Sequence, residues 1–293
     1  MGWRLQLAGG AAWIVLCVLA GQTHVIADEK KAERTFGVIE KEARSDYSHI
    51  RIRRKNNVRT MLFVRESGEE VGESQADIRK PGHLLVPYTQ FMFASYLFKP
   101  NPRRVLVVGV GGGSMVNFLT QQAPEVHVDA VEIDPVVVKL AAEYFDTVPS
   151  EKVNIITADG AKFLEETENK YDVIYMDAFL QPSEKTDDAG VPLELKTEQF
   201  YRMVQTKVAA DGVVVFNLDI RKKTKDDIQT LRRTFSQLHL FRAAKTNFVA
   251  IGLVAEKPVS LSTQRSRARQ IDRVWDTNFT LHRMLSRKVK LRR

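Results

Sequence analysis

The sequence predicts an α/β protein whose main sheet is parallel and covered by helices on both faces, with a small antiparallel β-sheet ahead of it. Three observations predict this class. Residues 105–114 have the pattern of a strand, a glycine-rich turn and the start of a helix. Three more apolar segments follow, each leading to an acidic residue, and two segments of alternating polarity precede them. Continuous apolar segments are typical of buried parallel strands, whereas alternation is typical of strands with one exposed face.

The glycine-rich turn is the segment around which the other predictions are arranged. Residues 105–108 are four apolar residues, three of them β-branched, and Gly109, Gly111 and Gly113 follow them. Glycine allows positive φ angles and lets a ligand approach the backbone closely. The N-terminus of the next helix presents free N–H groups to whatever occupies the turn. We therefore predict a nucleotide-binding strand–turn–helix unit, for which a plain packing turn is the alternative.

The composition fits a globular protein and limits the chemistry. Of 293 residues, 44% are hydrophobic and 27% are charged, which is ordinary for a folded domain. The net charge of +8 is concentrated in the tail, because residues 263–293 contain ten Lys or Arg and two Asp or Glu. The body is nearly neutral, so no nucleic-acid partner is expected. The single cysteine, Cys17, excludes a disulfide framework and a cysteine-based metal or redox site.

Residues 1–27 are predicted to be a signal peptide, so we expect the protein to be exported, as a periplasmic or secreted protein. Arg4 supplies a basic start, and residues 11–20 are apolar. Val25 and Ala27 stand at the −3 and −1 positions of a cleavage site. The apolar core is shorter than the roughly 20 residues of a membrane-spanning helix. An uncleaved N-terminal anchor is the alternative.

The region before the glycine-rich turn, 28–98, is predicted to hold the small β-sheet and a linking helix. Residues 28–45 are charged and are expected to be helical or irregular. Residues 47–53 and 59–65 alternate in polarity and are predicted strands with a turn between them. The aromatic segment 91–98 is predicted to be a helix that packs on the main sheet.

The second predicted strand of the main sheet, 126–132, ends at Glu132, which lies 19 residues after Gly113. In dinucleotide-binding folds an acid about 20 residues beyond the glycines accepts hydrogen bonds from ribose hydroxyls. We predict this role for Glu132. Asp134 precedes Pro135 and is expected mainly to cap the next helix.

Two further strands bring acids to the same edge of the predicted sheet. Residues 153–156 lead to Asp159 and Gly160. The Asp159 carboxylate is predicted to accept a hydrogen bond from an adenine amino group, with helix capping as the alternative. Residues 171–176 lead to Asp177. Open α/β sheets bind ligands at the carboxyl ends of their strands, so we expect Asp177 to lie beside the glycine-rich turn.

The rest of the chain is predicted to complete the domain 99–258. A long polar loop, 180–193, is expected to cover the site as a lid. One more parallel strand and an antiparallel pair are expected after it. The basic tail, 259–293, is expected to form a helix packed on the body, and contact with an anionic membrane surface is the alternative.

Three acids at successive strand ends beside a glycine-rich turn favour an adenosyl ligand. Ribose hydroxyls and the adenine amine account for Glu132 and Asp159, and Asp177 is left to face a positive centre such as a sulfonium or an amine. The sequence therefore favours an S-adenosyl-type co-substrate and transfer of one of its carbon groups. It contains no His/Cys cluster and no glycine–lysine phosphate loop, so neither a metal site nor a nucleotide triphosphatase is expected.

From about Tyr47 to Val254 the sequence resembles the spermidine synthase, or polyamine aminopropyltransferase, family. The segments that carry the resemblance are the approach to the glycine loop, the ribose-binding segment, the adenine-contacting pair and the strand before the catalytic aspartate. In this chain they are residues 100–109, Val131–Asp134, Asp159–Gly160 and residues 171–177. The resemblance implies a Rossmann-like, methyltransferase-type sheet with helices on both faces, preceded by a small N-terminal antiparallel β-domain.

The resemblance also implies an activity: transfer of an aminopropyl group from decarboxylated S-adenosylmethionine to a small amine such as putrescine, which releases methylthioadenosine. On this basis Asp177 is the expected base for the attacking amine, assisted by Tyr88. The residues expected to contact the donor are Gln75, Gly109, Gly111, Gly113, Glu132, Asp159 and Gly160. No metal is expected, and the family's oligomers imply a homodimer.

Two positions depart from the family pattern. Gly112 and Leu180 stand where the family usually carries aspartates. The acids of the lid, Glu184, Asp187 and Asp188, are the remaining candidates to substitute for them. Two other functions therefore stay open: an S-adenosylmethionine-dependent methyltransferase, and a non-catalytic nucleoside-binding relative in the periplasm.

Overall fold

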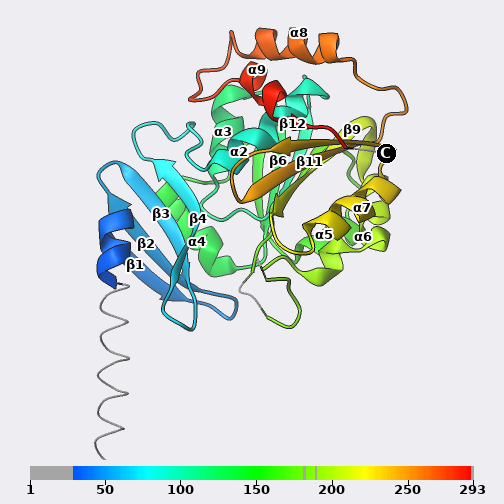
Figure 1. Ribbon diagram of the computed structural model, residues 1–293. Coiled ribbons are helices and arrows are strands. Elements are labelled where there is room, and N and C mark those ends of the chain that lie inside the picture. Colours follow the sequence, from blue (N-terminus) through cyan, green and yellow to red (C-terminus); the bar gives the residue numbers. More distant parts are fainter. Residues whose placement is uncertain (1–28, 181–182, 189, 292–293) are drawn as a thin grey trace, which may run out of the picture.

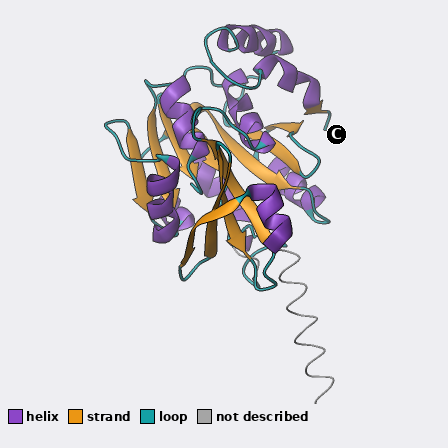
Figure 2. Ribbon diagram, turned by 90° about the vertical axis from the view of Figure 1, so that its left-hand side faces the viewer, coloured by secondary structure: helices purple, strands orange, loops and turns teal. Residues whose placement is uncertain are grey.

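The computed structural model describes residues 29–180, 183–188 and 190–291. Within them the chain forms a four-stranded sheet in its N-terminal part and an eight-stranded sheet in the remainder (Figure 1). Helices lie on both faces of the larger sheet (Figure 2). The predicted fold class is confirmed. The predicted signal peptide and Cys17 lie outside the described residues.

The N-terminal sheet keeps its strands in chain order, each antiparallel to the next. They are β1 (Val38–Arg44), β2 (His49–Lys55), β3 (Val58–Val64) and β4 (Glu70–Asp77). The two segments predicted from alternation are β2 and β3. Sequence reasoning missed β1 and β4. The charged segment 28–45 is helical only over residues 29–36 and then forms β1, which has no buried residue to mark it as a strand.

The N-terminal sheet is fixed to the main domain through α4 (Pro135–Phe145). Ile50, Ile52 and Met61 of the sheet share one buried apolar cluster with residues of this helix. On the sheet itself, the Arg53 guanidinium is buried and pairs with Glu70, with Nε 2.7 Å from Oε2. Each of the two groups has a further ionic partner, Glu29 for Arg53 and Arg51 for Glu70, so a network of ion pairs holds the start of β4. That matters for function, since β4 contributes to the site described below.

The main sheet has the strand order β12-β10-β11-β9-β8-β5-β6-β7. Its parallel strands are β5 (Arg104–Val108), β6 (His127–Glu132), β7 (Val153–Thr157), β8 (Tyr171–Met176) and β9 (Val208–Asp219). Its antiparallel strands are β10 (Gln237–Arg242), β11 (Asn247–Leu253) and β12 (Lys288–Val289). The central strand β5 pairs with β6 on one side and β8 on the other, so the chain order reverses there. Ligands of open α/β sheets bind at such a reversal.

Helices cover both faces of this sheet, as predicted. Val105 and Val107 of β5 belong to one apolar cluster, and Leu106 and Val108 belong to the other. This is why the strand is apolar at every position. One face carries α2 (Pro87–Met92), the 3₁₀ helix η1 (Phe93–Leu97), α3 (Ser114–Gln122), α8 (Leu261–Ile271), α9 (Leu281–Met284) and η3 (Leu285–Arg287). The other carries α5 (Gly160–Glu166), η2 (Leu193–Lys196), α6 (Glu198–Thr206) and α7 (Thr224–Thr234).

The basic tail packs back on the body, where α8 crosses one end of the molecule (Figure 1). Ala268, Ile271 and Leu281 are buried in the apolar cluster that includes η1 and α3. The ring of Trp275 meets Tyr96 edge-on at a centroid distance of 4.7 Å. Most apolar residues of the tail are therefore used in the core, whereas Val274 is exposed. No helix in the described part of the chain is long and apolar enough to cross a membrane.

Candidate active site

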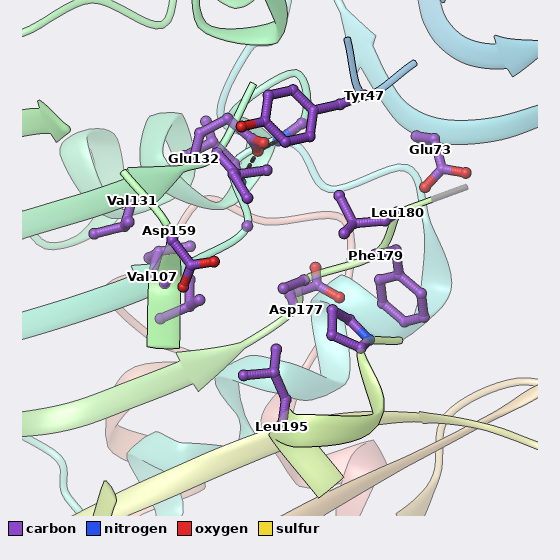
Figure 3. Close-up of a pocket in the computed structure, with 18 of the residues that line it drawn as sticks. Tyr47, Glu73, Val107, Val131, Glu132, Asp159, Asp177, Phe179, Leu180 and Leu195 are labelled. Atoms are coloured by element: carbon purple, nitrogen blue, oxygen red, sulfur yellow. Dashed lines mark hydrogen bonds between the residues drawn. The ribbon is translucent and has the colours of Figure 1, made fainter. Parts of the chain in front are cut away.

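A cavity of about 640 Å³ opens at the carboxyl ends of the central parallel strands, beside the N-terminal sheet (Figure 3). Its volume is typical of a small-molecule site. Seven of the nine residues predicted to form the site line it: Tyr88, Gly109, Gly111, Glu132, Asp159, Gly160 and Asp177. Gln75 and Gly113 are not among the lining residues.

The glycine-rich turn brings the ends of β5 and β8 together. Gly109 has a φ of +91°, and a Cβ atom there would lie 2.2 Å from the carbonyl oxygen of Asp177. The Asp177 N–H donates to the Val108 carbonyl at 2.9 Å, so the two strands stay paired up to the site. Any side chain at position 109 would push Asp177 away from its place. Glycine at this position therefore sets the position of the catalytic candidate.

Glu132 holds the turn from the other side. Its Oε2 accepts hydrogen bonds from the N–H groups of Val110 at 2.9 Å and Gly111 at 3.3 Å, and its Oε1 accepts one from Asp134 N–H at 3.2 Å. Burial raises the pKa of Glu132, and the hydrogen bond from Val110 opposes this shift. A carboxylate can accept about four hydrogen bonds, so one acceptor site on Oε1 is left for a ligand hydroxyl. The residue thus has a structural role that the sequence did not reveal, and its predicted ribose contact stays compatible with it.

Asp159 begins α5 and faces the cavity. Its Oδ1 accepts from the N–H groups of Ala161 at 2.8 Å and Lys162 at 3.0 Å, which is the geometry of a helix cap. Its Oδ2 accepts no hydrogen bond from the described residues. Oδ1 therefore caps the helix, and the predicted contact of Oδ2 with an adenine amino group stays a prediction.

Asp177 lies at the centre of a short hydrogen-bond network. Tyr88 Oη donates to Oδ2 at 3.1 Å, and Asn217 Nδ2 donates to Oδ1 at 2.9 Å. Asn217 is in turn held by Asn247, whose Nδ2 donates to its Oδ1 at 2.9 Å. Burial raises the pKa of Asp177 to about 7, although both hydrogen bonds favour the ionised form. A carboxylate with a pKa near neutrality is well matched to accepting a proton from a substrate.

Tyr88 is a donor to Asp177 and not a base itself. Burial raises the pKa of its phenol well above the ordinary value, and the negative charge of Asp177 adds to this effect. The phenol therefore keeps its proton and can orient the carboxylate. Pro87 at the first position of α2 fixes the start of the helix that carries Tyr88.

A further acid, Glu73, enters the cavity from the N-terminal sheet and was not predicted. Met61 pairs with Ser74 and Leu62 pairs with Gly72, so Glu73 is the extra residue of a β-bulge. Bulges re-aim side chains, and this one directs Glu73 into the cavity. Glu73 and Asp177 therefore enter the cavity from different walls (Figure 3). Burial and the negative charge of Asp177 raise the pKa of Glu73 to about 7. An acid in a β-strand before the nucleotide unit carries no motif by which sequence could have identified it.

The other predicted contacts lie elsewhere. Gln75, two residues beyond the bulge, pairs with Thr60, and its Nε2 lies 3.4 Å from Thr60 Oγ1. A Cβ atom at Gly113 would lie 2.2 Å from Thr147 Oγ1, so this glycine serves close packing at the start of α3. Their roles in ligand binding stay predictions.

The described residues of the loop after β8 form part of the cavity wall, and the action of this loop as a lid stays a prediction. Phe179, Leu180 and Leu195 line it (Figure 3). Leu180 N–H donates to the Gly190 carbonyl at 2.8 Å, which closes the loop on itself. Leu180 thus presents an apolar side chain to the site.

The acids of this loop do not face the cavity. Glu184, Asp187 and Asp188 are absent from its lining. The Asp187 carboxylate lies 2.6 Å from Lys196 Nζ, which also pairs with Asp227 of α7 at 2.7 Å. These ion pairs tie the loop to the body and leave Asp187 unsuited to hold an amine. Across the described residues, no group of three or more His, Cys, Asp or Glu side chains is arranged to bind a metal ion.

The fold and the cavity define a Rossmann-like α/β protein with an acid-lined site at the reversal of strand order. A family model described as the spermine/spermidine synthase domain matches residues 89–265, which is more than half of the chain. The chain therefore belongs to the spermine/spermidine synthase family.

Individual proteins agree with this assignment. The chain is 29% identical over 230 residues to a polyamine aminopropyltransferase of Vibrio vulnificus, covering 76% of this chain and 75% of the relative. A crystal structure of spermidine synthase in complex with the transition state analogue AdoDATO is similar with a TM-score of 0.67 and 17% identity, covering 86% of this chain and 85% of that chain. The crystal structure of human methyltransferase-like protein 13 in complex with SAH is similar with a TM-score of 0.60 and 24% identity, covering 68% of this chain and 99% of that chain. At these identities the structural likenesses concern the fold.

Proposed function

We propose that this protein is a polyamine aminopropyltransferase, which transfers an aminopropyl group from decarboxylated S-adenosylmethionine to a small amine such as putrescine. The observation that carries the proposal is Asp177, a half-buried carboxylate with a pKa of about 7, oriented by Tyr88 and Asn217 toward the cavity. The family membership and the name of the Vibrio vulnificus relative support it.

The residues present suit an adenosyl donor. The free acceptor site on Glu132 Oε1 suits a ribose hydroxyl, and Asp159 Oδ2 suits the adenine amino group. Both carboxylates line the same cavity as Asp177, on the side of β6 and β7. The donor would then place its sulfonium end toward β8.

The reaction is a displacement at carbon. The neutral amine nitrogen donates its lone pair to the methylene carbon bonded to sulfur, the carbon–sulfur bond breaks, and its electron pair stays on sulfur as a neutral thioether. The new carbon–nitrogen bond leaves an ammonium group, whose proton passes to the Asp177 carboxylate. Tyr88 and Asn217 keep both oxygens of that carboxylate in place, so the reactants meet in a defined orientation.

An S-adenosylmethionine-dependent methyltransferase is the second candidate, because Gly112 brings no carboxylate to the glycine loop and because the fold is similar to that of methyltransferase-like protein 13. S-Adenosylmethionine carries a carboxylate that would meet the negative field of Asp177 and Glu73. This field makes the decarboxylated donor the better match.

The experiment that tests the proposal is calorimetric binding with the chain from Asp28, followed by an assay of products. Methylthioadenosine and decarboxylated S-adenosylmethionine should bind more tightly than S-adenosylhomocysteine, and putrescine should yield spermidine. Preference for S-adenosylhomocysteine would identify a methyltransferase instead. Nucleoside binding without turnover of any amine would identify a non-catalytic relative.

Export and assembly are further parts of the proposal. The predicted signal peptide supports a periplasmic or secreted protein, and N-terminal sequencing of the mature chain should then begin at Asp28. The basic tail supports contact with an anionic membrane surface, which flotation with vesicles of acidic lipid would detect. A homodimer, expected from the family, is tested by light scattering of the purified protein.

A further inference from the structure

A substrate amine is a cation, and a buried cation needs an acidic partner. Asp177 must accept a proton in the proposed reaction and cannot also serve as a permanent counter-ion. Gly112 and Leu180 supply no carboxylate, and the three lid acids do not line the cavity.

Position 112 is closely packed by side chains of the neighbouring elements. The Gly112 N–H donates to Ser74 Oγ at 2.9 Å, and its carbonyl accepts from Thr147 Oγ1 at 2.9 Å. A Cβ atom on Gly112 would lie 3.0 Å from Ser74 Cβ and 3.0 Å from the Phe145 ring. Strand β4 therefore packs directly on the glycine loop, at the place where an aspartate would otherwise extend.

The residue next to that contact is Glu73. The bulge in β4 turns the Glu73 carboxylate into the cavity while Ser74 packs on Gly112. No described residue forms a hydrogen bond or ion pair with the Glu73 carboxylate. The cationic group with a favourable electrostatic effect on it is Arg65, and the acids Asp177 and Glu132 act against its ionisation. An acid held in this position without a partner is costly to the folded protein unless a ligand supplies the positive charge.

We propose that Glu73 binds a primary ammonium group of the substrates and so replaces, from the N-terminal sheet, the carboxylate that position 112 lacks. The inference rests on the proposed aminopropyl transfer. The ammonium belongs either to the aminopropyl arm of the donor or to the amine acceptor, since both are cations that enter this cavity. In either case the carboxylate at position 73 disfavours S-adenosylmethionine, whose own carboxylate it repels.

The test compares Glu73→Gln, which keeps the size of the side chain and removes its charge, with Glu66→Gln. Glu66 is an exposed acid in the turn between β3 and β4, so its variant removes one negative charge outside the cavity. Affinities for methylthioadenosine, decarboxylated S-adenosylmethionine and S-adenosylmethionine are measured by calorimetry, and KM for putrescine is measured by assay. Methylthioadenosine has no ammonium group, so it reports on the nucleoside site alone.

We expect Glu73→Gln to change the affinity for methylthioadenosine by less than about twofold. The affinity for the cationic substrate that Glu73 binds should fall about ten- to hundredfold, as expected for loss of a charge-assisted hydrogen bond. A weaker Kd for the decarboxylated donor assigns Glu73 to the aminopropyl arm, and a higher KM for putrescine assigns it to the acceptor. S-Adenosylmethionine should bind more tightly to this variant than to the wild type. Glu66→Gln should behave as the wild type.

Two results would overturn the inference. One is a Glu73→Gln protein with unchanged affinities and KM; the other is an equal loss for all three nucleosides, which indicates a structural role for Glu73. Both are read against a wild type that binds the decarboxylated donor and makes product. A wild type that does neither refutes the proposed aminopropyl transfer itself.

Discussion

Tyr88 and Asp177 lie 89 residues apart in the sequence, and the phenol of the first donates a 3.1 Å hydrogen bond to the carboxylate of the second. The contact joins the helix that precedes the glycine-rich turn to the end of β8. Asn217 occupies the other carboxylate oxygen from β9. Three separate elements thus converge on one titratable group, which is the arrangement expected for a positioned base.

Asp177→Asn removes the base and keeps the shape of the side chain. We expect the rate of amine transfer to fall by about 10²- to 10⁴-fold, the range of general base catalysis. Methylthioadenosine affinity should change less than about twofold, because Glu132 and Asp159 remain. Single-turnover assays and calorimetry measure the two effects. Full activity in this variant would show that Asp177 is not the base.

Tyr88→Phe deletes one donor to Asp177. Because a hydrogen bond to a charged group contributes about 1.5–3 kcal/mol, we expect kcat to fall roughly ten- to hundredfold. Tyr96→Phe is the matched control: Tyr96 is a buried tyrosine of η1 whose hydroxyl has no hydrogen-bond partner among the described residues. That control should keep full activity. Equal losses in both variants would mean that Tyr88 acts only through packing.

The pH dependence of the rate should show the titration of Asp177. Its pKa of about 7 means that the carboxylate is protonated, and inactive as a base, at lower pH. We expect the rate to fall about tenfold per pH unit below that value. Glu73 has a pKa in the same range. The fall in rate at low pH, the acidic limb of the profile, therefore reports the coupled titration of Asp177 and Glu73.

Asn217→Ala provides the comparison for this limb. It removes a hydrogen bond that favours ionised Asp177, so the pKa should rise and the limb should move to higher pH. Both proteins are assayed with the same amine, whose own titration then cancels. An acidic limb at the same pH in both proteins would show that the observed titration is not that of Asp177.

Stability of the ligand-free protein should decrease as pH rises from about 5 to 8. Asp177 and Glu73 have pKa values of about 7 in the folded protein, above their ordinary values of 3.8 and 4.5. Between the ordinary and the raised pKa values, the folded state therefore binds more protons than the unfolded state. The stability that these bound protons provide is lost as the pH rises through about 7. Thermal unfolding of Asp177→Asn beside the wild type measures the effect. The Tm of the variant minus the Tm of the wild type should be about 2 °C or more higher at pH 8 than at pH 5. A Tm difference that does not change with pH would contradict the pKa shifts.

Gly109→Ala tests the close approach of β5 and β8. The added Cβ would lie 2.2 Å from the Asp177 carbonyl oxygen, in addition to the strain of φ +91°. We expect a loss of at least about 2 kcal/mol in the free energy of unfolding and a large loss of activity. Gly68→Ala is the control, since Gly68 has φ +85° and no atom within 4 Å of its added Cβ. It should lose only about 1–2 kcal/mol, by backbone strain, and keep its activity.

The main sheet and most of its site could be predicted because they follow local rules. Apolar strands ending in Glu132, Asp159 and Asp177 must bring those acids to one edge when the strands are parallel. The turn at Gly109 marks where the edge opens. These statements need only the order of the elements, which the sequence contains.

Glu73 and β1 could not be predicted, for two physical reasons. The direction of Glu73 depends on a bulge, and a single extra residue in β4 reverses which side chains face the cavity. Strand β1 is held by backbone pairing with β2 at an edge, so its side chains carry no hydrophobic pattern. Gln75, chosen by resemblance, stands two positions from the residue that the bulge turns inward.

The packing of Trp275 gives this protein an intrinsic optical probe. The other two tryptophans, Trp3 and Trp13, lie in the predicted signal peptide, so a mature chain starting at Asp28 contains one indole. That indole contacts Tyr96 of η1, the continuation of the helix that carries Tyr88. Its fluorescence should therefore report, without any label, whether the tail is seated and whether the helix behind the active site moves when a substrate binds.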